Sequence, residues 1–207
     1  MTKIPKKLLW FGIIFFVAGM TAYYAGQDSV VPARSQEAVI EEPLQLPVRT
    51  KTANCITNGS LPDPQCTPGA VFPNVTKEQT CVQGYTKTVR SVSVSLKKKV
   101  YREYGVSYPP PFGTYELDHY IPLALGGNND ISNLWPFAAD PRPGFIEKDL
   151  TVNYLHRKVC AGEIGISTAQ RAIITPWVAV YNSIPQADKE ELKKMFPTWA
   201  RNQKPAE

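Results

Sequence analysis

Histidine is scarce in this chain, and several common catalytic signatures are missing altogether. Only two histidines occur in 207 residues, so any histidine chemistry must use His119 or His156. No G-x-S-x-G segment is present, which argues against a serine hydrolase built on a nucleophile elbow. The four cysteines include no C-x-x-C pair, which argues against a structural zinc site. No internal repeat is visible either.

Positive charge is also limited. The net charge is +5, and three lysines near the N-terminus (Lys3, Lys6 and Lys7) supply much of it, which excludes a histone-like basic coat. The composition is 43% hydrophobic and 20% charged, which is apolar enough for a buried core and argues against wholesale disorder. We therefore expect a globular body that meets any anionic partner through a local patch.

A hydrophobic segment follows those lysines. Residues 1–7 form a basic stub that we expect in the cytoplasm, and residues 8–25 carry no charge. As a helix the second segment would reach roughly 27 Å, enough to cross a bilayer core. The alternative is a cleaved signal peptide, but Tyr23 and Tyr24 occupy positions where a cleavage site needs small residues, which favours an anchor. Both readings place the body outside the cytoplasm, on the periplasmic or extracellular side.

All four cysteines lie beyond the hydrophobic segment, which is typical of a chain that folds in an oxidising compartment. Four cysteines allow three pairings, and the sequence alone does not choose among them. We favour one bond between Cys55 and Cys66 and another between Cys81 and Cys160.

Composition divides the remainder of the chain into four parts. Residues 26–54 are predicted as a flexible linker and 55–80 as a Pro/Gly-rich, disulfide-tied lead-in. The folded body is predicted over 81–197, followed by a polar tail at 198–207.

Hydrophobic periodicity and capping residues predict the elements of the body. They are a helix over 93–104, a strand over 114–121 returning at 133–135, a helix over 145–160, a helix capped by Ser167 and Gln170 and kinked at Pro176, and a last helix over 187–196.

The segment over 116–136 carries the most informative motif. It contains Asp118-His119, then Pro122, then Gly126-Gly127, and finally Asn133 before Leu-Trp-Pro. This spacing resembles the HNH endonucleases of the His-Me finger (ββα-metal) superfamily, in particular a bacterial branch reading D-H-x-I-P-L-x-L-G-G-x-N-D-x-x-N-L-W-P. The resemblance implies an α+β fold with a small ββα-metal core and additional flanking helices.

The resemblance also implies chemistry. His119 would be the general base that takes a proton from water, and Asp118 would be a metal ligand. Asn133 would brace the loop and orient the base. One divalent cation is expected, Mg²⁺ first, with Mn²⁺, Ni²⁺ or Zn²⁺ as alternatives. The expected substrate is the phosphodiester backbone of DNA, or of RNA, with little sequence preference.

The last metal ligand departs from the family pattern. The expected position falls at Arg142-Pro143, so we divide the assignment between Glu147 and His156, with Asp149 behind them. Lys148, Arg157 and Lys158 lie on the same predicted helix and are candidate phosphate contacts, or simply solvated surface.

One geometric condition tests these expectations. Neighbouring residues on a regular strand point to opposite faces, so Asp118 and His119 can share a site only at a strand end or distortion. If the ligands do not converge, we expect instead a catalytically degenerate binding or structural module of the cell envelope.

Overall fold

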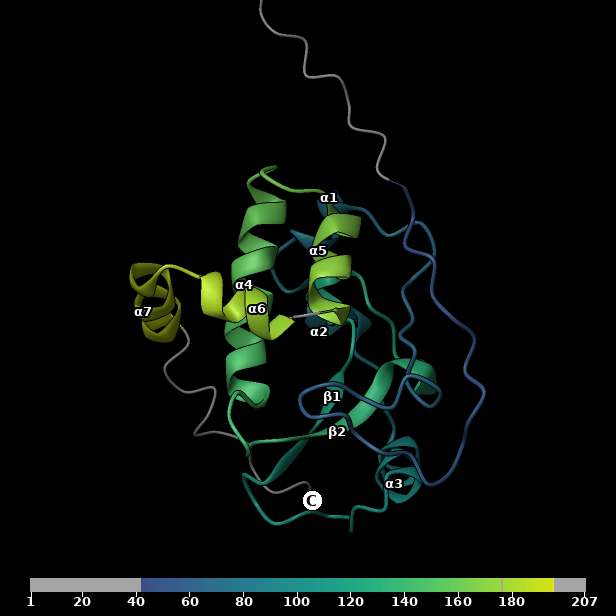
Figure 1. The fold of residues 1–207 in the computed structure, drawn as a ribbon. Helices are drawn as coiled ribbons and strands as arrows, with labels where there is room; N and C mark the ends of the chain where they lie inside the picture. Colours follow the sequence, from purple (N-terminus) through teal and green to yellow (C-terminus); the bar gives the residue numbers. More distant parts are fainter. Residues whose placement is uncertain (1–41, 176, 196–207) are drawn as a thin grey trace, which may run out of the picture. The chain divides into compact units, whose positions relative to one another are not determined.

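The computed structural model describes residues 42–175 and 177–195, all of which belong to one compact unit spanning Ile40–Glu207. It is a mixed α/β structure with a small sheet, as expected for an α+β fold (Figure 1). The predicted membrane segment 8–25, residues 26–41 of the predicted linker and the polar tail lie outside the described residues. No helix in the described part has both the length and the apolar character needed to cross a bilayer.

The elements follow one another in an order that surrounds the motif with helices. They are α1 (Lys77–Thr80), α2 (Tyr85–Val89), α3 (Val94–Glu103), β1 (Tyr115–His119), the 3₁₀ turns η1 (Leu123–Leu125) and η2 (Ile131–Asn133), β2 (Leu134–Ala138), α4 (Phe145–Cys160), α5 (Ile166–Ile174), α6 (Trp177–Ser183) and α7 (Gln186–Met195).

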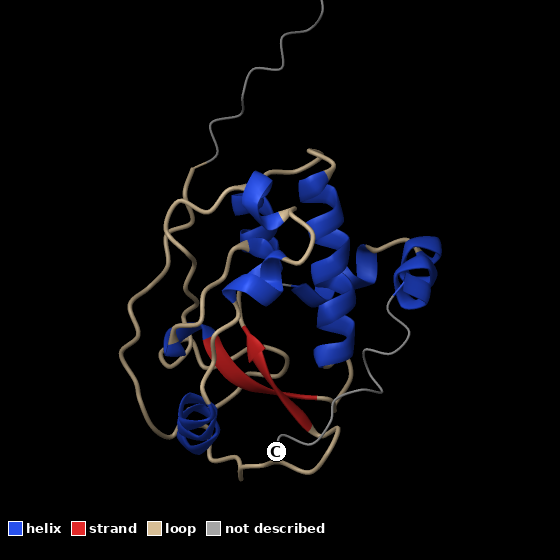
Figure 2. Ribbon diagram, turned by 180° about the vertical axis from the view of Figure 1, so that it is seen from behind, coloured by secondary structure: helices blue, strands red, loops and turns tan. Residues whose placement is uncertain are grey.

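The sheet is a two-stranded antiparallel pair, seen as crossing strands in Figure 2. Its register pairs Tyr115 with Ala138 and His119 with Leu134. The loop between the strands carries η1 and η2, and α4 follows β2 after a tight bend. Gly144 is required at that bend, because a Cβ there would lie 2.3 Å from the Ala139 carbonyl oxygen.

The hydrophobic core lies between the sheet and the C-terminal helices. Trp135 and Phe137 of β2 are buried and stack with ring centroids 4.3 Å apart, and Trp177 of α6 meets Phe137 edge-on. Leu155 of α4 and Ile173 of α5 belong to the same cluster. Burial of this cluster fixes α4 against the hairpin, and α4 carries one wall of the candidate site described below.

Most predicted helices are found close to their expected bounds. α3 begins where Ser93 caps it, with the Leu96 amide donating to Ser93 Oγ at 3.2 Å, and α4 spans the predicted 145–160. The predicted capping box at Ser167 is wrong: the N-cap is Gly165, and the Gln170 side chain donates to the Leu125 carbonyl at 2.8 Å. The Gln170 side chain thus bonds to Leu125 in η1 and not to the start of its own helix. Pro176, the predicted kink, lies outside the described residues.

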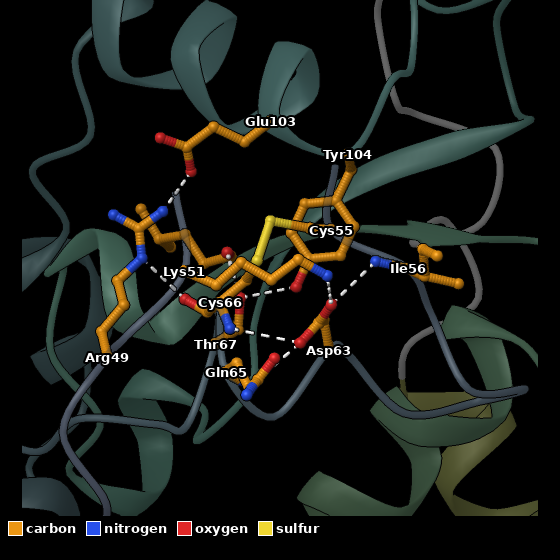
Figure 3. The surroundings of a disulfide bond; sticks show 11 residues. Arg49, Lys51, Cys55, Ile56, Asp63, Gln65, Cys66, Thr67, Glu103 and Tyr104 are labelled. Carbon is orange, nitrogen blue, oxygen red and sulfur yellow. Dashed lines mark hydrogen bonds and ion pairs between the residues drawn. A yellow bond between two sulfur atoms is a disulfide. The ribbon is translucent and has the colours of Figure 1, made fainter. Parts of the chain in front are cut away.

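The disulfides join Cys55 to Cys66 and Cys81 to Cys160, the pairing that we favoured. Cys55 and Cys66 are both buried in the segment that precedes α1 (Figure 3). The second bond connects the C-terminus of α1 with the last residue of α4.

Residues just before Cys55 are not a linker, although we predicted one through residue 54. Arg49 donates to the Cys66 carbonyl at 2.8 Å and forms an ion pair with Glu103, which is buried in α3 (Figure 3). Lys51 pairs with Asp63 at 2.9 Å. The ordered body therefore starts before Arg49, and the partners lie too far along the chain for a local pattern to reveal them.

Candidate functional site

A cavity of about 610 Å³ opens beside β1 and is the candidate site. Its walls come from β1, η1, α4 and the region of α2, and Met195 of α7 also lines it. Asp118 and His119 both line it. Asp118 and His119 could share a site only at a strand end or at a distortion. They lie at a strand end, because His119 is the last residue of β1.

His119 is almost fully buried, with 4% of its surface exposed, and Nε2 lies 3.1 Å from Asn129 Oδ1. Burial lowers its pKa to about 4, although the Asn129 hydrogen bond and the Asp118 charge act in the opposite direction. The imidazole is therefore neutral at pH 7 and has a lone pair that can accept a proton.

Asn133 is completely buried and holds the loop that follows His119. Its Oδ1 accepts from the Ile121 amide at 2.8 Å, while Nδ2 donates to the carbonyls of Ile121 at 2.9 Å and Asn128 at 2.8 Å. This is the bracing role predicted for it. No hydrogen bond joins Asn133 to the His119 side chain among the described residues, so any effect on His119 passes through the backbone.

Three carboxylates line the cavity together with His119, namely Glu116, Asp118 and Asp149. Burial raises the pKa of Asp149 well above its usual range, and the negative charges of Glu116 and Asp118 raise it further. Mutual repulsion among these carboxylates would be relieved by a bound cation. Glu116 was not among the predicted site residues, although its i, i+2 spacing from Asp118 places both on one face of β1.

Lys148 already supplies one positive charge to this cluster. Its side chain is 2% exposed, forms an ion pair with Asp118 Oδ2 and donates to the His119 carbonyl at 2.8 Å. The prediction that Lys148 contacts nucleic acid is therefore wrong, because its ammonium group is buried and already paired.

Glu147 and His156, our first choices for the last metal ligand, do not line the cavity. Glu147 accepts from the Gly144 amide at 2.8 Å and pairs with Arg142, so it closes the N-terminus of α4. His156 lies beside the second disulfide, with Nε2 3.0 Å from the Thr80 carbonyl oxygen. The geometry of α4 explains both errors. Relative to Asp149, which does line the cavity, Glu147 is rotated by about 200° around the helix axis, and His156 lies about 10 Å further along that axis.

Arg157 and Lys158, the other predicted phosphate contacts, also lie away from the cavity. Arg157 pairs with Asp188 and Glu191 of α7, at 2.5 and 3.1 Å, and Lys158 pairs with Glu163 at 2.6 Å. The cations on the cavity wall are instead Lys87 and Arg90, on α2 and at its C-cap. Within the described residues neither forms a side-chain hydrogen bond or ion pair. The i, i+3 spacing of Lys87 and Arg90, which places both on one side of a helix, is the sequence signal that could have identified them.

Two groups of residues bear on metal binding. The ligand atoms of Cys81, His156 and Cys160 lie within 4.8 Å of one another. Within the described ranges, no other three His, Cys, Asp or Glu side chains bring their ligand atoms this close together. Both sulfurs belong to the second disulfide, however, and metals bind the thiolate. The cavity offers carboxylates, the ligands of a hard cation such as Mg²⁺, which binds through one or two carboxylates and keeps several waters. The donor set therefore fits Mg²⁺ better than Zn²⁺ or Ni²⁺.

No protein-family model, curated protein or solved structure was found to match this chain.

Proposed function

We propose that this protein is an exported, metal-dependent endonuclease of the HNH type that hydrolyses phosphodiester bonds of DNA. The observation that carries the proposal is a neutral, buried His119 at the wall of a cavity that also holds three carboxylates. The chemical reason is that hydrolysis needs a base for water and positive charge for the phosphate.

Each group of side chains has a role in this reaction. His119 accepts a proton as the water oxygen bonds to phosphorus and the phosphorus–oxygen bond to the departing strand breaks. Lys87 and Arg90, on α2 and at its C-cap, hold the flanking phosphates. Asp118 and Asp149, with Glu116 beside them, are the residues that would hold a divalent cation, Mg²⁺ first and Mn²⁺ next. When bound, that cation supplies charge neutralisation at the phosphate and at the departing oxygen.

The same proposal places the enzyme outside the cytoplasm, held in the membrane by residues 8–25 or released after their removal. Two disulfides in the described part of the chain support an oxidising compartment. Free DNA outside the cytoplasm is then the substrate that the enzyme would meet, with RNA as an alternative.

A second candidate function is a non-catalytic binding module of the envelope. One specific observation favours it: the Lys148 ammonium group forms an ion pair with Asp118 Oδ2, an oxygen that a metal ion would otherwise use. In addition, the ligand atoms of Asp118, His119 and Asp149 do not converge within 4.8 Å. A binding module would keep the cavity and bind an anion there without cleaving it.

The deciding experiment is plasmid nicking by the full-length chain in detergent, disulfides intact, with Mg²⁺, Mn²⁺, Ni²⁺ or Zn²⁺ and an EDTA control. His119→Ala should lower the rate by a factor of about 10² or more, because the general base is lost. His156→Ala is the matched control, since it removes the other histidine far from the cavity and should leave the rate within about twofold. No cleavage by the folded wild-type protein in any of these metals would favour the binding module, whereas equal loss in both variants would overturn the assignment of His119 as the general base.

A further inference from the structure

The carboxamide of Asn129 has an orientation that two backbone groups fix independently. The Ser91 amide donates to Oδ1 at 3.2 Å, and Nδ2 donates to the Val89 carbonyl at 2.7 Å. A backbone N–H can only donate and a backbone carbonyl can only accept. Exchanging the oxygen and nitrogen of Asn129 would break both hydrogen bonds, so the assignment of these two atoms follows from the contacts themselves.

This orientation determines which nitrogen of His119 carries hydrogen. Oδ1 of Asn129 lies 3.1 Å from His119 Nε2, and a carbonyl oxygen can only accept a hydrogen bond. Nε2 must therefore be the N–H nitrogen. A neutral imidazole has one N–H, so the lone pair resides on Nδ1, which forms no hydrogen bond to another residue in the described part of the chain.

We propose that Asn129 is the positioning residue of the site: it selects the Nε2–H tautomer of His119 and so makes Nδ1 the atom that accepts the proton from water. This inference rests on the proposed nuclease function. It also connects two parts of the site, because Val89 and Ser91 flank Arg90, one of the two cavity cations. Asn133, which binds the Asn128 carbonyl, holds the backbone next to Asn129.

Asn129 is distinct in role from Asn128, its neighbour. The Asn128 side chain donates to the Val71 carbonyl and accepts from the Asp130 amide, both at 2.9 Å, and no hydrogen bond joins it to His119 within the described ranges. Both asparagines stabilise the same loop, but only Asn129 touches the imidazole. Asn128→Ala is therefore a control for loss of loop bracing alone.

The test is the ¹⁵N spectrum of the two histidines in the full-length protein, solubilised in detergent, without metal and at pH 8. Ring-labelled histidine gives signals for His119 and His156 only, and His156→Gln assigns them. The wild type should show His119 as the Nε2–H tautomer. Asn129→Ala should give a mixture of tautomers, whereas Asn128→Ala should not. Asn129→Asp should keep the wild-type tautomer, because a carboxylate still accepts from Nε2–H and from Ser91.

Cleavage rates complete the experiment. Asn129→Ala should lower kcat by at least about tenfold with little change in KM, and Asn129→Asp should recover much of the loss. A wild-type spectrum with hydrogen on Nδ1, or an Asn129→Ala spectrum identical to wild type, would overturn the role of Asn129. The expected tautomers in a protein that cleaves no DNA would instead overturn the nuclease function, and the two failures are thus distinguishable.

Discussion

Asp63 is a buried carboxylate whose partners all stabilise its charged form. It pairs with Lys51 and accepts the backbone amides of Ile56 and Gln65, at 3.0 and 2.9 Å (Figure 3). Burial alone would raise its pKa, but these hydrogen bonds outweigh burial and lower the pKa from 3.8 to about 2. The group therefore binds protons less readily in the folded chain than in the unfolded chain.

This pKa shift predicts how stability depends on pH. Because the pKa of Asp63 is lower in the folded chain, its ionised form contributes about 2 kcal/mol to the free energy of unfolding. This contribution is complete well above pH 4 and is lost as the pH falls through about 2. Asp63→Asn should lower the free energy of unfolding by that amount at pH 7, and the difference from wild type should shrink between pH 5 and pH 2. Urea unfolding at several pH values measures it.

Glu163→Gln is the control for this prediction, since Glu163 forms an exposed ion pair with Lys158. Removing that pair should change stability by less than about 1 kcal/mol at any pH. A difference between Asp63→Asn and wild type that stayed constant down to pH 2 would contradict the titration of Asp63 as its cause.

At this scale the sequence predicts some site residues and misses others for a physical reason. Asp118, His119 and Asn133 belong to one short segment whose loop geometry is local: Asp118 and His119 line the cavity, and Asn133 holds the loop that follows them. Asp149, which was predicted only as the third choice for the last ligand, and Arg90, which was not predicted, line the cavity from α4 and from the end of α2. Their relation to β1 depends on how helices pack against a hairpin, which residue spacing alone does not encode.

At the scale of elements, the loop between β1 and β2 depends on a glycine for space. A Cβ at Gly127 would lie 1.7 Å from the Ile121 carbonyl oxygen and 3.0 Å from Asn133 Nδ2. The Ile121 backbone cannot move away easily, because Asn133 binds both its amide and its carbonyl. Close packing of backbone against backbone, and not a left-handed conformation, is what requires glycine here.

Gly127→Ala should accordingly lower the free energy of unfolding by roughly 3 kcal/mol or more, or prevent folding. Gly59→Ala is a matched comparison: its Cβ would meet nothing within 4 Å, so only its positive φ of 59° opposes the change, at a cost of about 1 kcal/mol. Thermal unfolding of both variants measures the difference. Similar losses in the two would show that the loop can shift to accept a methyl group.

The elements also show where prediction from sequence is reliable. The helix over 145–160 and the antiparallel return after Asn133 were predicted because caps, glycine and hydrophobic spacing act locally. The start of α5 was not, because Gln170 donates to Leu125 in η1 instead of capping its own helix. The break between α5 and α6 was predicted only as a kink within a single helix.

For the whole molecule, the two disulfides constrain the unfolded chain to different extents. Cys81 and Cys160 are separated by 79 residues, and Cys55 and Cys66 by 11. By loop-closure entropy the long loop contributes about 4.5 kcal/mol and the short one about 3 kcal/mol. The double variant Cys81→Ser/Cys160→Ser should therefore lose more stability than Cys55→Ser/Cys66→Ser, as urea unfolding would measure. The reverse order would mean that local packing around Cys55 outweighs chain entropy.

The long disulfide has a further consequence for the fate of the chain after proteolysis. Cys81 precedes the end of α2 that carries Arg90, and Cys160 ends the helix that carries Asp149. One backbone cut in the connector between α3 and β1 would separate Arg90 from His119 in sequence, yet both fragments would stay covalently joined. Such nicked protein should migrate as a single species on a gel without reductant and as two with it. Residues 81–160 thus form a covalently closed ring that includes the cavity residues Arg90, His119 and Asp149, and a protease must cut this ring twice to release a fragment from within it.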